Sequence, residues 1–399
     1  MFKVTFSFED GSVVEAFANA GDNLLEVARS ANVAIDAPCS GNGACGKCRV
    51  QLKSGELDSK KTLHISDEEY QAGWRLSCCS KISADVNVLV PDIASAYKSR
   101  MKVADLSSKE EIAIFENAKR DIELAGIELK NSLEVVEVVM TPPSLDDTMP
   151  DNERLTRALR KYLNINRVRI PYVVLKKLPD VLRENNFAVK CVIRATSDDM
   201  FVYDIFGKEE DVVIGGLAVD IGTTTVSAVL INMENGEILA KSSAGNGQIR
   251  FGADVINRII EQQKPGGKKK LQDAVIKETI NPMIAQMCKS AGIPASHIYR
   301  MSVGANTTMN HLFAGINADP VRMEPYIPAF FKTNSLFASD VGIAINKDAH
   351  IIIAPNIGSY VGGDITAGTL VSMIWNRPEF SLFIDLGTNG ELVFGNSDF

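Results

Sequence analysis

Histidine and tryptophan are scarce in this 399-residue chain, which contains four histidines and two tryptophans. The histidines stand far apart, and no two of them have the close spacing that places two imidazoles on one metal ion. A histidine-based metal centre is therefore not expected, and surface or helix-capping roles are predicted instead. The four positions are His64, His297, His311 and His350.

An excess of positive charge is also lacking, because 42 Lys and Arg residues face 50 Asp and Glu residues, for a net charge of -8. Nucleic acids and anionic membrane surfaces attract clustered positive charge, so we expect neither as a partner. No apolar run reaches the ~20 residues that span a bilayer. The chain opens on an alternating strand pattern, not on a basic stretch followed by an apolar core. These absences predict a cytoplasmic protein.

Seven cysteines are too few for a disulfide scaffold in a chain of 399 residues. Three of them, Cys39, Cys45 and Cys48, share a glycine-rich segment with the spacing Cys-x5-Cys-x2-Cys, and Cys78 follows later. Each iron of a two-iron, two-sulfur cluster takes two thiolates, and the plant-type spacing is one residue shorter. Glycine suits such a loop because its backbone adopts positive φ without strain. We therefore predict a [2Fe-2S] cluster bound by these four cysteines.

Two alternatives bear on this cysteine set. Structural zinc usually takes two short Cys-x2-4-Cys pairs, and only one such pair is present. Cys79 could replace Cys78 as the fourth ligand, but the preceding Arg-Leu-Ser resembles the segment before the last ligand of ferredoxins and favours Cys78. Cys79 is then expected to point the opposite way. Cys191 and Cys288 stand alone in apolar surroundings and are predicted to be core residues.

Residues 1–92 are predicted to form a β-grasp ferredoxin domain, and residues 93–130 an amphipathic linker helix. The linker is either a tether for a movable redox head or a helix packed on its neighbour. In the first domain the residue pattern predicts strands at 2–8, 12–18, 48–53 and 86–90, a helix near 23–31 capped by Gly21-Asp22, and a short helix from Ser66.

Residues 131–210 are predicted to form a small α/β domain without a catalytic constellation. Its expected elements are a strand at 135–139, a helix at 152–163, a short apolar run at 172–175, a helix from Pro179 and a strand at 189–195.

The remaining residues, 211–399, contain an internal repeat. Gly216–Thr225 and Leu382–Glu391 each read as a buried strand, a turn rich in Gly, Thr and Asn, and a second apolar run. This pattern predicts a β-hairpin and not a Walker P-loop, because no Gly-Lys-Ser/Thr occurs there. Backbone amides and hydroxyls of such turns can hold phosphate, and Asp220 and Asp385 at the strand ends suit Mg²⁺ bound through water. The candidate phosphate residues are Gly222, Thr223, Thr224, Gly387, Thr388 and Asn389.

Two such hairpins a domain apart resemble the ATPase superfamily of acetate and sugar kinases, Hsp70 and actin. The resemblance implies that 360–368 starts a connecting helix with Asp364 orienting water or metal. In 302–309 it implies that Asn306 and Thr307 face the nucleotide, unless that stretch is simply an N-capped helix.

The resulting fold class is α+β multidomain: a β-grasp [2Fe-2S] ferredoxin domain, a small α/β middle domain and an actin/Hsp70-like (RNase H-like) ATPase domain. Its first lobe is expected to extend to about residue 378, with 379–399 as the start of a second lobe. No candidate for the superfamily's adenosine loop is present, so we expect this lobe to be truncated, with an unpaired edge and an uncovered apolar face.

The whole combination is similar to the reductive activators of corrinoid enzymes. The resemblance implies that an iron–sulfur electron, coupled to ATP with Mg²⁺, returns a Co(II) corrinoid to Co(I) in methyl-transfer pathways. It also implies two partners, a corrinoid protein or corrinoid-dependent methyltransferase and an upstream low-potential electron donor. The segments that carry it are Ala37–Cys48, Asp220–Thr225, Phe251–Ile256, Val303–Phe313 and Asp385–Glu391.

Two other functions remain open on the sequence alone. The chain could be a [2Fe-2S] electron carrier whose C-terminal part is a docking module without ATP turnover. A phosphotransferase of the sugar- or acid-kinase type would need a catalytic base and a substrate pocket, and the sequence offers no convincing candidate for either.

Overall fold

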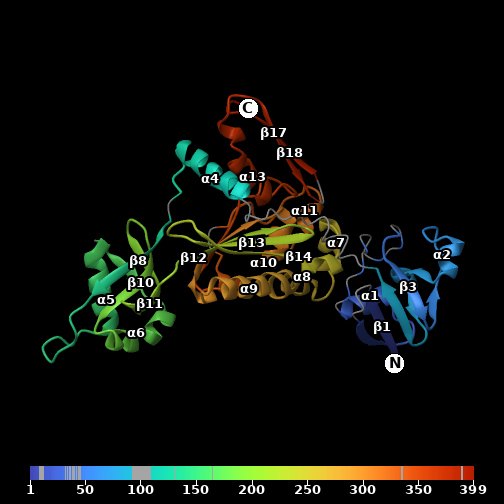
Figure 1. The fold of residues 1–399 in the computed structure, drawn as a ribbon, viewed down its shortest axis with the longest axis horizontal. Coiled ribbons are helices and arrows are strands. Elements are labelled where there is room, and N and C mark those ends of the chain that lie inside the picture. The colour runs from blue at the N-terminus through green and yellow to red at the C-terminus, as the bar shows by residue number, and fades with distance from the viewer. Residues whose placement is uncertain are drawn as a thin grey trace.

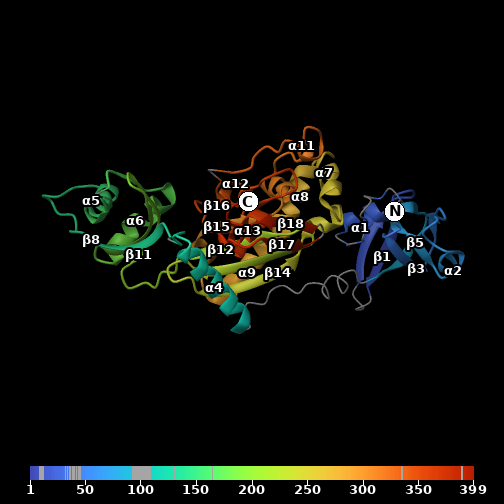
Figure 2. The same ribbon diagram turned by 90° about the horizontal axis from the view of Figure 1, so that it is seen from above.

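The structure is a computed structural model. It describes residues 1–8, 13–31, 33, 35, 37, 41, 43, 46–91, 109–129, 131–163, 165–333, 336–387 and 390–399. Three folded units lie in a row, with a central body between an N-terminal head and a small α/β unit (Figures 1 and 2). Among the described residues, every helix is too short or too polar to serve as a transmembrane span.

The head is a twisted sheet packed on one helix. Its strand order is β2-β1-β7-β3-β5, with β1 and β7 parallel, and α1 buries Leu24, Leu25 and Ala28 beneath the sheet. A small second sheet pairs β4 with β6. The elements are β1 (Phe2–Phe8), β2 (Val13–Ala18), α1 (Leu24–Ser30), β3 (Arg49–Ser54), β4 (Leu57–Ser59), α2 (Asp67–Gln71), β5 (Trp74–Leu76), η1 (Ser77–Cys79), β6 (Ser80–Ile82) and β7 (Val86–Val90).

The predicted strands of the head and its Ser66-capped helix are confirmed. The predicted cap of α1 is wrong, because the N-cap is Asn23 and not Gly21-Asp22. The side-chain oxygen of Asn23 accepts hydrogen bonds from the amides of Leu25 and Glu26. Asparagine is among the best N-cap residues. The prediction placed the N-cap of the helix one residue too early, at Asp22 instead of Asn23.

The small α/β unit has the strand order β8-β10-β11-β9. The separate helix expected from Pro179 is wrong, since one helix, α6, includes both the apolar run at 172–175 and Pro179. Val174, Leu178 and Leu182 recur every four residues on its buried face, and this packing outweighs the hydrogen bond that the proline removes. The elements are β8 (Leu133–Val139), α5 (Asp151–Leu163), β9 (Arg167–Arg169), α6 (Tyr172–Glu184), β10 (Ala188–Ala195) and β11 (Asp199–Gly207).

Helix α4 (Lys109–Leu124) lies before this unit and packs against α13 of the body. Ile122 on this helix is buried, and the ammonium of Lys119 lies beside Gly236 of the body. Of the two alternatives for the linker, these contacts favour the helix that packs on its neighbour.

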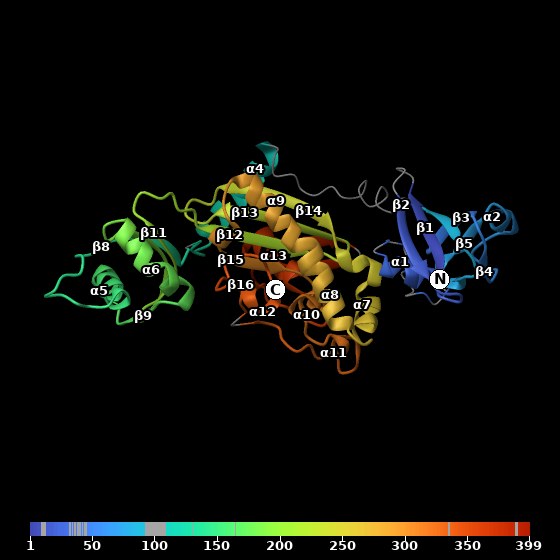
Figure 3. The same ribbon diagram turned by 90° about the horizontal axis from the view of Figure 1, so that it is seen from below.

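The body is a five-stranded sheet with the order β14-β13-β12-β15-β16. Strands β12, β13 and β14 form an antiparallel meander, and β12, β15 and β16 are parallel. One face packs on the continuous helical rod α8–η3–α9, and α13 with the β17–β18 hairpin lies on the other face (Figures 1 and 3). The main core of the molecule lies between the sheet and this rod.

The strands of the body are β12 (Gly215–Ile221), β13 (Thr225–Asn232), β14 (Ile238–Gly245), β15 (Ile298–Gly304), β16 (His350–Ile353), β17 (Ser381–Leu386) and β18 (Gly390–Gly395). The longer helices are α7 (Val255–Gln262), α8 (Gly267–Val275), α9 (Asn281–Ala291), α10 (Thr307–Ala314) and α13 (Gly363–Ser372). The short ones are η2 (Gly247–Phe251), η3 (Ile276–Ile280), η4 (Ala295–His297), α11 (Asp319–Arg322), α12 (Ala338–Val341) and η5 (Ile374–Asn376).

Both sequence repeats are antiparallel hairpins, β12–β13 and β17–β18, as predicted. The second hairpin packs one face on α13, where Phe383 meets Gly368. The opposite face is apolar and exposed, and it carries Leu382, Ile384, Leu392 and Phe394. Among the described strands, β17 and β18 pair only with each other, so the expected uncovered apolar face is present.

The first turn of α13 is packed directly on the end of β15. A Cβ atom added to Gly362 would lie 2.3 Å from the carbonyl oxygen of Ala305, a backbone atom that cannot easily move away. We expect Gly362→Ala to destabilise the body by about 1–3 kcal/mol, the usual cost of overpacking, and to lower its melting temperature. Gly358→Ala is the control, because no atom lies within 4 Å of its added Cβ. Equal melting temperatures for the two variants in a thermal scan would contradict this packing.

Candidate functional site

Two of the predicted cluster ligands converge in the core of the head. Cys48 precedes β3 and Cys78 lies in the 3₁₀ turn η1, and their sulfur atoms are 3.1 Å apart. Both side chains are buried, with 1% and 9% exposure. The Ser77 amide donates to the Cys48 carbonyl at 2.8 Å and fixes the two segments together. Cys39 and Cys45, the other two predicted ligands, lie outside the described residues.

Hydrogen bonding between these thiols separates their proton affinities. It lowers the pKa of Cys48 to about 6 and raises the pKa of Cys78. A thiolate is the form of cysteine that binds metal. Two buried sulfur atoms that approach each other in this way are the donor set that a shared iron site requires, so these residues fit an iron–sulfur cluster.

The predicted orientation of Cys79 is wrong. Its sulfur lies 3.6 Å from that of Cys78 and faces the loop, where a Cβ added to Gly43 would be 3.1 Å away. The expectation of opposite side chains assumed an extended strand, but successive side chains in a 3₁₀ turn do not alternate between two faces. The expected backbone of the loop is confirmed, because Gly41, Gly43 and Gly46 all have positive φ.

In the body, acidic side chains from separate segments come together at one end of the sheet. Asp220 on β12 is paired in register with Gly304 on β15, and the Cα of Asp364 lies 3.9 Å from a Cβ added to that glycine. Asp385 on β17 is paired with Glu391 on β18. The structure therefore brings together the three aspartates chosen from the sequence, and it adds Glu391.

Burial and mutual repulsion raise the proton affinity of these carboxyl groups. The pKa of Asp220 rises to about 6, first because neighbouring protein displaces part of the water around its carboxyl group and then because of the charges of Asp364 and Asp385. Burial also raises the pKa of Asp364 and Glu391, with Asp385 adding to both. Asp220 nevertheless remains in contact with solvent, so an ion can reach it.

Direct coordination by three of these groups does not occur in this arrangement. Within the described ranges, no three His, Cys, Asp or Glu side chains lie close enough together to hold one metal ion. Mg²⁺ usually retains several waters and takes one or two carboxylates plus phosphate oxygens. The acidic cluster therefore suits a cation held largely through water.

The first hairpin turn is held from behind by the body. The side-chain amide of Asn246 donates to the Gly222 carbonyl at 2.9 Å, and its backbone amide donates to the Thr224 carbonyl at 2.8 Å. The buried guanidinium of Arg258 donates to the Thr223 carbonyl between them. In a trans peptide the N–H points away from the C=O. The amides that follow these carbonyls therefore face away from Asn246 and Arg258, as an anion-binding turn requires.

Asn246, Arg258 and Glu391 did not emerge from the sequence as site residues. Arg258 follows the Phe251–Ile256 segment that carried part of the family resemblance, and Glu391 ends the second repeat. Those two segments were the available signal, although neither reveals a contact with the first hairpin turn or with the aspartates. Desolvation lowers the pKa of Arg258 to about 9, which leaves it charged at neutral pH.

The other predicted residues have mixed outcomes. Asn306 caps α10 by accepting from the Met309 amide, so the alternative of a capped helix is the correct one. Thr307 is buried and donates to the Gly358 carbonyl at 2.6 Å, so it does not face a nucleotide. Gly387 is exposed beyond β17, and Thr388 and Asn389 lie outside the described residues.

The roles predicted for the isolated cysteines and for the histidines also differ in outcome. Cys191 and Cys288 are buried, as predicted. His311 is fully buried, contrary to the predicted surface or capping role. Its Nε2 accepts from the Ala329 amide at 3.0 Å, and its Nδ1–H therefore donates to the Thr307 carbonyl at 2.7 Å. This histidine joins α10 to the following loop.

Known protein families match three consecutive segments of the chain. Residues 7–83 match the 2Fe-2S iron-sulfur cluster binding domain, residues 122–211 match the RACo linker region, and residues 215–377 match the RACo middle region. The head is therefore a domain of the 2Fe-2S type, and the two further units are similar to the linker and middle regions of RACo.

Individual proteins resemble the chain over most of its length. The corrinoid activation enzyme RamQ of Eubacterium limosum is 29% identical over 377 residues, which cover 94% of this chain and 56% of RamQ. A solved reductive activator for a corrinoid, iron-sulfur protein is 33% identical with a TM-score of 0.60, covering 100% of this chain and 62% of its own. The chain thus spans about three fifths of these two proteins.

The head alone resembles a further group of proteins. One component of the Na(+)-translocating NADH-quinone reductase of Actinobacillus succinogenes is 35% identical over 91 residues, which are 22% of each chain.

The convergence of Cys48 and Cys78 predicts which thiols the cluster needs. We expect Cys48→Ser to lose the normal visible absorption and EPR signal of a [2Fe-2S] cluster, because a serine hydroxyl is far less acidic than a thiol and is a poorer iron ligand. Cys79→Ser is the matched control and should keep both signals. The sulfur of Cys79 lies 3.6 Å from that of Cys78, further than the 3.1 Å between the sulfur atoms of Cys48 and Cys78. Retention of a normal cluster in Cys48→Ser, or its loss in Cys79→Ser, would reassign the ligands.

The raised pKa of Asp220 predicts a stability that depends on pH. Its pKa in the folded state, about 6, is higher than that of an aspartate in the unfolded chain. Its contribution to stability is therefore favourable at low pH and is lost as the pH rises through about 6. Without Mg²⁺, we expect the melting temperature of Asp220→Asn to exceed that of the wild type by a few degrees at pH 8 and by less at pH 5.

Millimolar Mg²⁺ should reduce the difference in melting temperature between Asp220→Asn and the wild type, because a cation offsets the repulsion among the carboxylates. Asp211→Asn, which removes an exposed carboxyl outside the cluster, is the control. A difference between Asp220→Asn and wild type that does not change with pH would show that the pKa of Asp220 is not raised in the folded state.

Proposed function

Since the chain is homologous to the reductive activators of corrinoid proteins, we propose that it delivers electrons, coupled to ATP, to a Co(II) corrinoid protein and restores the Co(I) state. The observation that supports the ATP-linked part is the convergence of Asp220, Asp364 and Asp385 beside a hairpin turn whose carbonyl groups are held by Asn246 and Arg258. A group of aspartates alone, or a hairpin turn alone, is common in proteins, but the two side by side form a site for Mg²⁺ and phosphate.

In this proposal, Cys39, Cys45, Cys48 and Cys78 hold the [2Fe-2S] cluster in the head. When bound, the cluster supplies one electron at a time, which is the change that converts Co(II) to Co(I). Burial of Cys48 and Cys78 keeps bulk water away from their sulfur atoms, which is one of the factors that set a cluster's reduction potential.

The body supplies the nucleotide site. The turn of Gly222, Thr223 and Thr224 offers amides to phosphate, and Gly387, Thr388 and Asn389 are assigned the same role in the second hairpin. Asp220 and Asp385 hold Mg²⁺ through water, and Asp364 orients a water molecule. The proton affinity of Asp364, raised by burial, suits a carboxyl group that exchanges a proton with that water.

Two partners follow from the chemistry, a corrinoid protein or corrinoid-dependent methyltransferase that receives the electron and a low-potential donor that supplies it. Reduction of Co(II) to Co(I) is energetically uphill, which gives ATP its role. Thiol ligands require a reducing compartment, so we place the protein in the cytoplasm.

The alternative is a [2Fe-2S] electron carrier whose body is only a docking module. A docking module has no need of repelling carboxylates packed close together, and such a cluster costs stability unless a cation or ligand offsets it. The acidic cluster therefore favours ATP turnover over the simple carrier.

ATP hydrolysis by the full-length protein, measured with and without a Co(II) corrinoid partner, separates the two functions. We expect the partner to stimulate hydrolysis, and we expect Asp220→Asn to reduce the rate by at least ~100-fold while the cluster spectrum stays unchanged. Asp211→Asn is the control for loss of one negative charge. If the wild-type protein reduces the corrinoid without hydrolysing ATP, the carrier is the correct function.

A further inference from the structure

The head and the body meet where α1 approaches the short turn η2. The Nε–H of Arg29, in the last turn of α1, donates to the carbonyl oxygen of Arg250 at 3.0 Å across 221 residues of sequence. Arg29 is only 5% exposed, although it carries a charge. Figures 1 and 2 both place α1 on the side of the head that faces the body.

The geometry of Arg29 is fixed on the head side as well. Its terminal NH1 group pairs with Glu26, one turn earlier on α1, at 2.6 Å. The ion pair neutralises and orients the guanidinium, which leaves the Nε–H directed at the body. A buried arginine with two hydrogen-bonded groups is a specific contact and not a chance surface approach.

On the body side, η2 is a rigid receptor for this contact. The Gly247 amide donates to the Thr279 hydroxyl at 3.0 Å, and Arg250 forms an ion pair with Glu278. Thr279 and Glu278 belong to η3, a π-helical interruption in the rod that packs on the sheet. Phe251 at the end of η2 is buried in the body's core. The Arg250 carbonyl therefore keeps one position relative to the sheet.

The same turn is joined directly to the candidate phosphate site. Asn246 caps η2 by accepting from the Gln248 amide, and it also donates to the carbonyls of Gly222 and Thr224. Asn246 and Arg250 are only four positions apart in the chain. A change in the backbone of the phosphate turn is thus transmitted to η2 through the two hydrogen bonds that this one buried residue donates.

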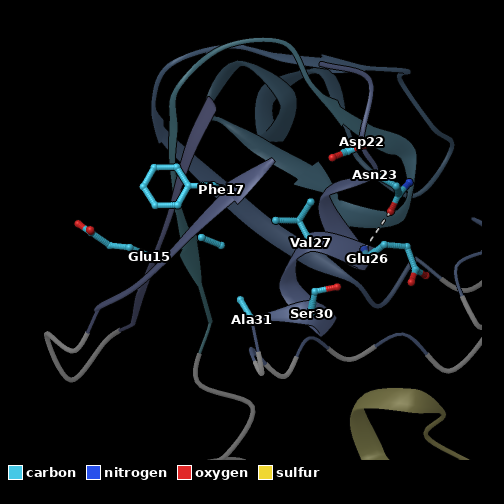
Figure 4. Close-up of a pocket in the computed structure, with 9 residues that line it drawn as sticks. Glu15, Phe17, Asp22, Asn23, Glu26, Val27, Ser30 and Ala31 are labelled. Carbon is cyan, nitrogen blue, oxygen red and sulfur yellow. Dashed lines mark hydrogen bonds between the residues drawn. The ribbon is translucent and has the colours of Figure 1, made fainter. Parts of the chain in front are cut away.

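The opposite end of α1 reaches the cluster site. Asn23, the N-cap of the helix, donates its side-chain amide to the carbonyl of Cys78 at 2.8 Å. Figure 4 shows Asn23 and Ser30 at the two ends of α1, with the Asn23–Glu26 hydrogen bond in the first turn. The same helix forms one side of an open groove of about 520 Å³ together with β2. One short helix therefore links a predicted cluster ligand to the body.

We propose that Arg29 is a positioning residue that docks the redox head on η2, and that docking and nucleotide binding at the 222–224 turn are thermodynamically coupled. This inference rests on the proposed function, because it assumes that the turn binds the phosphates of ATP. The two states are a docked head, with the Arg29–Arg250 contact made, and an undocked head. A nucleotide that binds better to the docked state shifts the population toward docking, and docking raises nucleotide affinity by the same factor.

The test compares wild type, Arg29→Gln and the control Lys53→Gln in the full-length, cluster-loaded protein. Lys53→Gln removes one positive charge from an exposed position of the same domain. Two quantities are measured: the dissociation constant of a non-hydrolysable Mg·ATP analogue by calorimetry, and hydrogen exchange of residues 24–30 and 247–252 with and without the analogue. The visible spectrum of the cluster reports that the head is folded.

In wild type and Lys53→Gln, we expect the analogue to slow exchange in both segments. In Arg29→Gln, exchange there should be faster, the effect of the analogue on 24–30 should vanish, and the analogue should bind about 5-fold or more weakly. If Arg29→Gln loses its cluster spectrum, Glu26→Ala removes the ion pair that orients Arg29 and is expected to act in the same direction.

Three outcomes overturn the inference, and they are distinguishable. Unchanged exchange at 24–30 in Arg29→Gln refutes the docking contact. Faster exchange with an unchanged dissociation constant refutes the coupling, while the ATP-linked function stands. If the analogue binds to neither wild type nor variant, the proposed nucleotide site fails, and the coupling fails with it.

Discussion

The carboxylates of Asp220, Asp364 and Asp385 repel one another, and the body must hold them together against that repulsion. Two backbone arrangements do so. Strand β12 is paired with β15 through Asp220 and Gly304, and the Gly363 amide at the start of α13 donates to the Ala305 carbonyl at 2.7 Å. Glycine is required at 362 because any side chain would strike the end of β15. The apolar core beneath the sheet stabilises this arrangement, and a bound cation would relieve its electrostatic cost.

The head and the body have separate hydrophobic cores. Folding of the cluster site therefore does not depend on packing in the proposed nucleotide site, and any communication between them passes through the surface where they meet. The hydrogen bonds of Arg29, Asn246 and Asn23 provide such a connection, because each one joins the ends of helices or turns and lies outside the two hydrophobic cores. Coupling between two such sites requires an element with two arrangements, and a docked or undocked head is the simplest one that this structure offers.

The sequence predicted the parts of the fold that depend on local periodicity and turn chemistry. Alternating strands, the two Gly-Thr hairpins and the capped helix at Ser66 follow from the residues that form them. The errors arose where packing decided the outcome. Packing of the buried face of α6 lets this helix continue past Pro179. The 3₁₀ turn η1 directs the side chain of Cys79 toward the cluster loop. Arg258 was missed and the role of His311 was predicted wrongly, because a buried polar residue is recognised by its partners, which can lie far away in sequence.

The carboxylates of the site lie on two different parts of the body. Asp220 and Asp364 belong to a five-stranded sheet and to a helix packed on it, whereas Asp385 and Glu391 lie on a hairpin attached through α13 and η5. Repulsion among these carboxylates therefore acts between the sheet and the hairpin. The Mg²⁺ ion proposed for this site, held through water by Asp220 and Asp385, would offset that repulsion.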